Sequence, residues 1–275
     1  MSEPSQREPL AGFPSIAEWQ GYEQRPERLE HRANRLAFPE WQGEPLAGKS
    51  LLIWAEQGYG DQIMAARFIP LLGAQSITYS GTVRLQRLFA QLPVTYSPLG
   101  QTIAILRHDY WILPMSLPLR FGVTEATLPS EPYLRAESRA KGGIGIAWSG
   151  NEIPSAARSL PAALGHKLLR LPGAVSLHPQ DSGAQDFMDT AEIIAGLDLV
   201  ITIDTSVAHL AGAMGKPCWL LLRRFADWRW MRDRADSPWY PSMRLFRQLN
   251  EGDWESVLNE VMLALEARDG EASCA

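Results

Sequence analysis

The stretch from Asp198 to Leu222 constrains the fold of this chain more than any other. Leu199–Ile203 is a short apolar run of mostly β-branched residues, as expected for a strand buried inside a parallel sheet. Helical spacing follows and stops at Gly215, and Cys218–Leu222 has the composition of a second buried strand. A strand, a helix and a strand in this order make a βαβ unit. We therefore expect an open α/β sheet whose ligands bind beyond the carboxyl ends of its strands.

The turn between the first of these strands and the helix gathers polar side chains. Asp204 ends the strand, Thr205 and Ser206 carry hydroxyls at the N-cap, Val207 begins the helical spacing, and His209 lies one turn further on. The unpaired N–H groups and the positive dipole end of such a helix favour an anion. These residues are therefore candidates for an anion site at which the imidazole is neutral until the anion arrives. The alternative is structural: the hydroxyls cap the helix and His209 packs in the core.

Composition and charge exclude several classes of protein. The chain has 275 residues, 45% of them hydrophobic, which suits two domains of moderate size. A net charge of −5 argues against nucleic acid as the main partner. The two cysteines suit neither a disulfide framework nor a metal cluster, and no Asp-x-Asp pair occurs. Because apolar runs of about 18 residues and a signal peptide are also missing, we expect a cytoplasmic protein without metal, cofactor or membrane span.

A second strand-to-helix turn occurs in the first half. Leu51–Ala55 is a buried strand, Gly58 and Gly60 follow it, and Asp61 opens a helix. A third glycine and an acidic residue about 20 positions further on are missing, so this is not a dinucleotide-binding fingerprint. We expect the glycines to let a ligand approach the backbone and Asp61 to lie at the lip of a cleft. Helix capping is the alternative role of Asp61.

The other elements indicate two α/β units in succession. Residues 1–14 are polar and proline-rich and are expected to be disordered, and the helices expected over 15–38 carry a mixed-charge, solvated face. The segment 135–143 is charged and then glycine-rich, as expected of a linker. We predict an N-terminal arm with helices over 1–45, a Rossmann-like domain over 46–138 and a second one over 139–275. The two doubly wound domains should face each other across a cleft.

The second unit supplies further candidates. Ser149 and Asn151 lie in the turn after a buried strand at 144–148, and Arg158 follows in a loop. A guanidinium suits phosphate oxygens because it binds them through two parallel hydrogen bonds. Four aromatic residues beyond the last strand either stack on a sugar or base, or pack beneath their own loop. They are Trp228, Trp230, Trp239 and Tyr240.

Several long motifs carry a family resemblance. They are Leu52–Asp61, Ala147–Asn151, Arg158–Pro161, Asp204–Ala213, Asp227–Trp230 and Ser237–Gln248. Together they resemble the glycosyltransferase domain of bacterial tetratricopeptide-repeat glycosyltransferases, which are related to the family 9 heptosyltransferases, over residues from about 40 to 265. The resemblance implies a GT-B fold, with the acceptor in the first domain and a nucleotide-activated sugar in the second. Matched by motif, Asp61 is the general base, and Thr205, Ser206 and His209 hold the donor phosphates.

The chain departs from these relatives at two points. Tetratricopeptide repeats of about 34 residues do not precede the domain, so the acceptor is expected to be recognised in another way. The acidic residue that relatives often carry just before the Arg158–Ser159 pair is also missing.

The residues and the resemblance together predict a metal-independent, inverting glycosyltransferase. It would move a sugar from a nucleotide-diphosphate donor to a hydroxyl of a glycan or protein, with Asp61 as the base. The expected donor site consists of Gly58, Gly60, Ser149, Asn151, Arg158, Asp204, Thr205, Ser206, Val207 and His209. Two alternatives stay open: a catalytically silent module that binds a sugar nucleotide or a protein, and a sugar-nucleotide epimerase.

Overall fold

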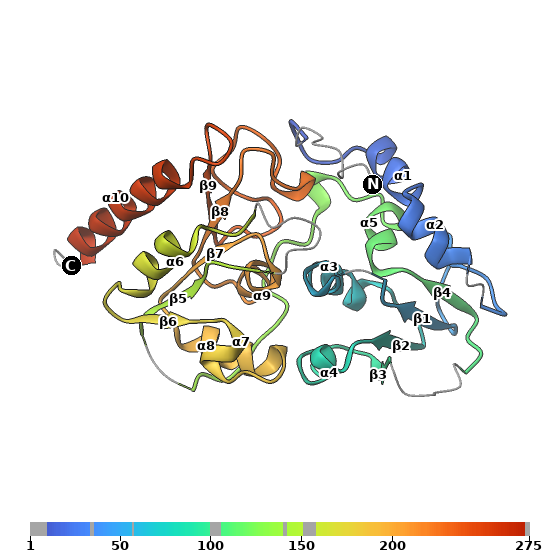
Figure 1. Ribbon diagram of the computed structural model, residues 1–275. Coiled ribbons are helices and arrows are strands. Elements are labelled where there is room, and N and C mark those ends of the chain that lie inside the picture. The colour runs from blue at the N-terminus through green and yellow to red at the C-terminus, as the bar shows by residue number, and fades with distance from the viewer. Residues whose placement is uncertain are drawn as a thin grey trace.

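The computed structural model of the chain describes residues 10–33, 36–56, 58–99, 106–139, 142–150 and 158–272. It contains two β-sheets with helices around them, which lie side by side (Figure 1). The four-stranded first sheet has the order β3-β2-β1-β4, and the five-stranded second sheet has the order β6-β5-β7-β8-β9. Every pair of neighbouring strands is parallel, which confirms the predicted α/β class.

The first half contains short elements. Its helices are α1 (Ile16–Glu23), α2 (Pro26–Ala33), α3 (Tyr59–Ala65), α4 (Val83–Phe89) and α5 (Leu117–Arg120), with 3-10 turns at Ala66–Leu71, Pro114–Ser116 and Glu125–Thr127. Its strands are β1 (Ser50–Trp54), β2 (Ser76–Gly81), β3 (Thr95–Pro98) and β4 (Tyr110–Ile112).

The second half repeats the alternation of strand and helix. Its strands are β5 (Ile144–Ala147), β6 (Ala174–Ser176), β7 (Leu199–Ile203), β8 (Cys218–Leu222) and β9 (Met243–Arg247). Its helices are α6 (Ala162–Leu169), α7 (Pro179–Ser182), α8 (Phe187–Gly196), α9 (Ser206–Ala213) and α10 (Trp254–Ala272), with a 3-10 turn at Trp228–Trp230.

The central strands β7 and β8 of the second sheet are buried on both faces, as their near-continuous apolar sequences predict. In β7, Ile201 and Ile203 belong to an apolar cluster with Val257 and Leu258 of α10. The neighbouring Val200 belongs to a different cluster on the other face. Successive strand residues point to opposite faces, so both faces of this strand must be apolar to be covered.

A single apolar core continues from the first half into the second. It includes Ile53 of β1, Ile63 of α3, Ala208 of α9 and Leu220 of β8. α3 and α9 pack against each other where the two halves meet (Figure 1). The halves therefore share packed side chains, and the domain boundaries at residues 45 and 138 stay a prediction.

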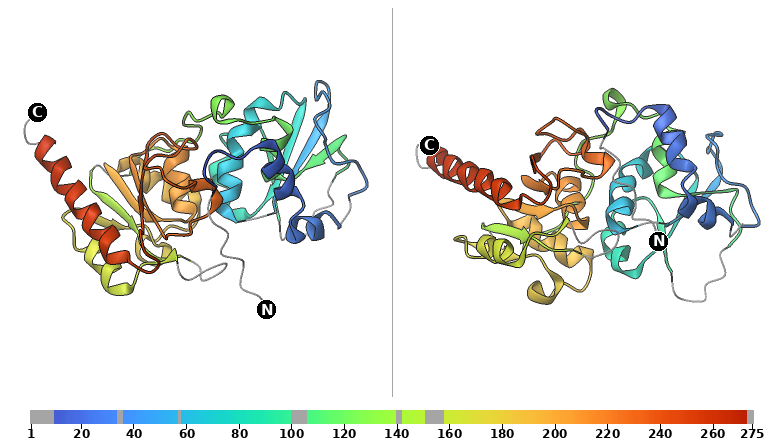
Figure 2. Two further views of the ribbon diagram at one scale, coloured as in Figure 1. Left: turned by 90° about the horizontal axis from the view of Figure 1, so that it is seen from above. Right: turned by 45° about the horizontal axis from the view of Figure 1, so that its top comes forward.

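The N-terminal segment touches both halves (Figure 2). The carbonyl of Leu10 accepts a hydrogen bond of 2.7 Å from the backbone N–H of Arg232. The rings of Phe13 and Trp239 have centroids 5.1 Å apart, and α1 also contacts α5 of the first half. The expectation of disorder is wrong for residues 10–14 because these contacts hold them, whereas residues 1–9 lie outside the described ranges.

The charged face of α1 and α2 is partly buried, which corrects the expectation of a solvated face. Arg28 is 1% exposed. Its guanidinium donates to Glu23 at 2.9 Å and to the hydroxyl of Ser116 at 2.6 Å, and it also bonds to Glu56. Because buried charges are tolerated only with partners, this network ties α2 to the end of β1.

Two elements were not expected from the sequence. The sequence indicated no helix at α7 and no strand at β9, which pairs with β8 along its whole length. Arg244 and Arg247 interrupt the apolar pattern of β9 because the strand lies at the edge of the sheet.

Candidate functional site

A cleft of about 1020 Å³ opens between the two halves. It lies at the carboxyl ends of β1, β5 and β7, where the topology of open α/β sheets places ligands. Its lining includes all the predicted site residues that the structure describes: Gly58, Gly60, Asp61, Ser149, Arg158, Asp204, Thr205, Ser206, Val207 and His209. Asn151 lies outside the described residues. The roles of these residues stay predictions, but their side chains and backbone share one cavity.

The turn after β7 forms one corner of this cleft. Thr205 is the N-cap of α9, and its hydroxyl accepts a hydrogen bond of 3.3 Å from the N–H of Val207. Gly150 lies against the same turn, since a Cβ atom there would be 3.0 Å from Thr205 Cγ2 and 3.7 Å from Arg158 Nε. A helix N-terminus and a guanidinium therefore converge, which is an arrangement suited to an anion.

His209 is buried and neutral. It is 5% exposed, and its Nδ1 lies 2.9 Å from the hydroxyl of Tyr240. Burial, with a smaller contribution from the positive charge of Arg67, lowers the pKa of His209 to about 3. The imidazole is neutral in the free protein, as expected. The further expectation, that it takes up a proton when an anion binds, stays a prediction, and the burial and Arg67 oppose the charged form.

Gly60 packs directly against His209, a contact that the sequence did not indicate. A Cβ atom at this position would be 2.5 Å from Cδ2 of His209. The space that a side chain of residue 60 would need is thus filled by the imidazole, and the approach of a ligand to the backbone of Gly60 from the cleft stays a prediction. Gly60 and His209 form the close contact that joins α3 to α9.

Asp61 is an ion-pair partner and not a helix cap. It is the third residue of α3, whose N-cap residue, Gly58, makes no side-chain cap bond. Its carboxylate bonds to the guanidinium of Arg229, which follows β8 in the second half. The same guanidinium donates to the carboxylate of Asp227 at 2.6 Å. One arginine therefore bridges carboxylates from the two halves.

Two further carboxyl groups in the cleft have perturbed pKa values. Burial raises the pKa of Asp204, against the positive charges of Arg158 and Arg223. Burial also raises the pKa of Asp227, and the nearby charge of Asp204 adds to this effect. Carboxyl groups with raised pKa values in a cleft are frequent at functional sites.

Glu56, the other carboxylate at the end of β1, faces away from the cleft. Its side chain is 2% exposed and bonds to Arg28, and it accepts a weak hydrogen bond of 3.4 Å from the N–H of Met115. Burial raises the pKa of Glu56 against the charge of Arg28. Of these two carboxylates, only Asp61 lines the cleft.

The aromatic residues beyond β8 pack inside the protein. Trp230 and Trp239 are 0% exposed and Tyr240 is 1% exposed. Trp228 is half-buried, and its ring centroid lies 5.1 Å from that of Trp19. Of the two interpretations, packing beneath the loop is therefore correct for this cluster, which joins the main core.

Sequence reasoning did not select Asp227 and Arg229 as site residues, although both line the cleft. The available signal was their position. They follow the carboxyl end of β8, as Asp204 follows β7, and parallel strands end at the same edge of a sheet.

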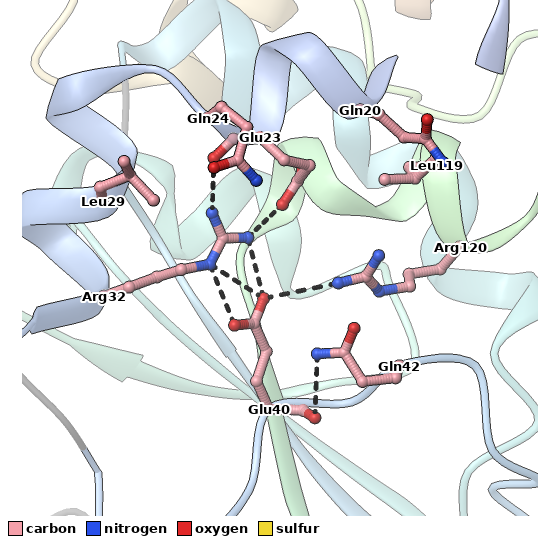
Figure 3. Close-up of a pocket in the computed structure, with 9 residues that line it drawn as sticks. All are labelled: Gln20, Glu23, Gln24, Leu29, Arg32, Glu40, Gln42, Leu119 and Arg120. Atoms are coloured by element: carbon pink, nitrogen blue, oxygen red, sulfur yellow. Dashed lines mark hydrogen bonds and ion pairs between the residues drawn. The ribbon is translucent and has the colours of Figure 1, made fainter. Parts of the chain in front are cut away.

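A second pocket, of about 350 Å³, lies between the N-terminal helices and α5. Figure 3 shows its charged side chains turned toward one another. Arg32 donates to Glu40 at 2.9 Å, and Arg120 lies 3.8 Å from the same carboxylate. These opposite charges are paired with one another, so the pocket does not need a charged ligand to neutralise them.

The described residues offer neither a metal site nor a membrane-spanning helix. Among them, His, Cys, Asp and Glu side chains form no group of three or more that is arranged to hold a metal ion. Within the same residues, every helix is too short or too polar to cross a membrane.

Comparisons with known proteins find similarity to a curated protein by sequence and to a solved protein by structure. No family model matches the chain. Protein FlbA of Caulobacter vibrioides is 28% identical over 321 aligned residues, which cover 93% of this chain and 52% of FlbA. The chain thus spans about half the length of this curated relative.

The solved structure is a glycosyl transferase family 9 protein from Veillonella parvula. The two structures have a TM-score of 0.57 and 13% sequence identity, over 82% of this chain and 99% of that one. Neither comparison supports the tetratricopeptide-repeat part of the resemblance. At this identity the likeness concerns the fold alone, which is similar to that of this family 9 glycosyl transferase.

Proposed function

We propose that the protein is a metal-independent, inverting glycosyltransferase of the GT-B type. It would move a sugar from a nucleoside-diphosphate donor to a hydroxyl of a glycan or protein. The observation that carries this proposal is the cleft, because it unites Asp61 of the first half with the anion-suited corner at Thr205, Val207 and Arg158 of the second. The family 9 fold is consistent with the same chemistry.

In the proposed reaction, Asp61 is the general base. It accepts the proton of the acceptor hydroxyl while the hydroxyl oxygen forms a bond to the anomeric carbon of the sugar. The bond from that carbon to the diphosphate oxygen breaks, and the leaving diphosphate keeps the electron pair. Attack on the face opposite the leaving group inverts the configuration at the anomeric carbon.

The leaving diphosphate would be stabilised by groups of the second half. The N–H groups at the start of α9 and the guanidinium of Arg158 line the cleft together and can meet the developing negative charge. His209 would contribute as a neutral group. Since these donors supply positive potential without a metal, we expect full activity in excess chelator. Loss of activity in EDTA that returns with magnesium or manganese would contradict this part of the proposal.

A thermal-shift panel of nucleotide sugars followed by turnover assays tests the function. A donor at about 100 times its dissociation constant should stabilise the protein by roughly 2.7 kcal/mol. A transferase then releases nucleoside diphosphate only when an acceptor is added. An epimerase converts the donor without an acceptor, and a silent binding module is stabilised without turnover. Either of these last results would replace the proposal.

A further inference from the structure

Arg229 connects the two halves of the protein inside the cleft. Its guanidinium bonds to Asp61, donates to Asp227 at 2.6 Å and lies over the ring of Trp228, 4.6 Å from the centroid. The Arg229 side chain is only 10% exposed, whereas those of Asp61 and Asp227 are 20% and 36% exposed. The buried guanidinium of Arg229 thus binds two carboxylates that are still partly exposed in the cleft.

This arrangement is unfavourable for a general base. An opposite charge within hydrogen-bond distance favours the ionised form of a carboxylate, so a carboxylate held by a guanidinium is a poor proton acceptor. Arg229 binds Oδ1 of Asp61, so one of the two oxygens that could accept a proton is already engaged. Asp61 therefore becomes a stronger base when this ion pair loosens.

A diphosphate in the same cleft offers Arg229 another partner. Arg229 lines the cleft together with Thr205 and Val207 of the anion-suited corner. The charge of Asp204, which directly precedes that corner, acts on Asp227. The guanidinium is therefore close to the place where donor phosphates would lie, and phosphate oxygens bind a guanidinium in the same bidentate manner as carboxylates.

We propose that Arg229 is a positioning residue that holds Asp61 in the empty cleft and transfers to the diphosphate of the donor, which frees Asp61. The inference rests on the proposed function, because it needs the cleft to be the donor site. It makes donor binding the step that activates the base. The acceptor is then deprotonated efficiently only when a donor is present.

Binding of inorganic pyrophosphate, measured by calorimetry, tests the transfer without a known donor. We expect Arg229→Gln to weaken pyrophosphate binding about tenfold or more, since a charged hydrogen-bond donor is lost. Asp61→Asn should tighten binding by about tenfold, because Arg229 no longer has to leave a carboxylate. In the double variant the gain should vanish, since the arginine that produces it is absent.

The double variant separates this inference from a simple charge effect. If Asp61→Asn tightens binding equally with and without Arg229, Asp61 acts only as a nearby negative charge and the inference is overturned. An unchanged affinity in Asp61→Asn overturns it as well. Asp236→Asn is the matched control, because it removes the partner of Arg234 at 2.8 Å outside the cleft and should leave the affinity unchanged.

Two further outcomes have defined meanings. If Arg229→Gln does not fold, Arg229→Lys replaces it, because an ammonium group lacks the planar bidentate geometry of a guanidinium and the gain from Asp61→Asn should shrink in that background. If the unaltered protein binds neither pyrophosphate nor any nucleotide sugar, the donor-site proposal fails and this inference fails with it. Binding without the expected coupling overturns only the role of Arg229.

Discussion

Asp61 and Glu56 are five positions apart in the sequence, but only Asp61 lines the cleft. We expect Asp61→Asn to lower kcat by about 10²-fold or more, since general-base catalysis contributes typically 10²–10⁴-fold. Glu56→Gln should keep kcat within a few-fold while lowering stability, because it weakens a buried bond to Arg28. Steady-state kinetics and urea unfolding of both variants check this. A large loss of kcat in Glu56→Gln together with a small loss in Asp61→Asn would instead assign the base to Glu56.

The buried imidazole of His209 should make stability depend on pH. Its pKa is about 3 in the folded protein, whereas an unfolded histidine has a pKa of about 6.5. The unfolded chain therefore binds more protons between these values, and stability falls as the pH drops below about 6.5. When the pH is lowered from 7.5 to 5.5, the free energy of unfolding should fall by about 1 kcal/mol more in the unaltered protein than in the His209→Gln variant. Urea unfolding at both pH values measures this, with the exposed His166→Gln as the control.

The contact between α3 and α9 depends on a glycine. A methyl group at Gly60 would meet the buried ring of His209 at 2.5 Å, whereas one at Gly58 would lie 3.5 Å from Asp61 Oδ2, an ordinary distance. We expect Gly60→Ala to destabilise the protein by about 1–3 kcal/mol through overpacking. Gly58→Ala should change the free energy of unfolding by less than about 1 kcal/mol. Chemical denaturation measures both variants. If they changed the free energy of unfolding equally, α3 and α9 could move apart at little cost and the prediction would be wrong.

The molecule as a whole should unfold in a single transition, because its main apolar core runs through both halves. Trp19 belongs to this core and contacts Trp228 and Trp239 of the second half. Trp19→Ala should lower the free energy of unfolding by about 3–5 kcal/mol, while alanine at Ile16, which is 42% exposed, should change it little. Tryptophan fluorescence and far-ultraviolet circular dichroism should give one midpoint in urea. Two separate midpoints would instead support independent domains.

The strand and helix that form the second half's side of the site could be predicted from the sequence, because each depends on residues within its own short segment. Leu199–Ile203 is apolar and β-branched, Thr205 has a capping hydroxyl, and Gly215 takes a positive φ of 68° beyond the end of α9. Ligands of open α/β sheets bind beyond the carboxyl ends of the strands, so the presence of Asp61 and Asp204 in the cleft could also be predicted. Each of these inferences needs only neighbouring residues and the rules of α/β topology.

Contacts between residues distant in sequence were decided only by the tertiary structure. The same charged residues of α2 would suit a solvated face, yet Arg28 is buried against Glu23 and Ser116. The pattern at 228–240 was equally compatible with stacking on a ligand, and Trp230 and Trp239 lie in the core instead.

The sequence by itself determined the α/β class, the two strand-to-helix turns and the candidate residues that line the cleft, since periodicity, caps and strand ends are properties of short segments. The bridge from Asp61 through Arg229 to Asp227 was decided by tertiary structure alone. Asp61 and Arg229 are separated by 168 positions. Whether they become partners depends on how two sheets pack around a shared core, and no local pattern records that geometry.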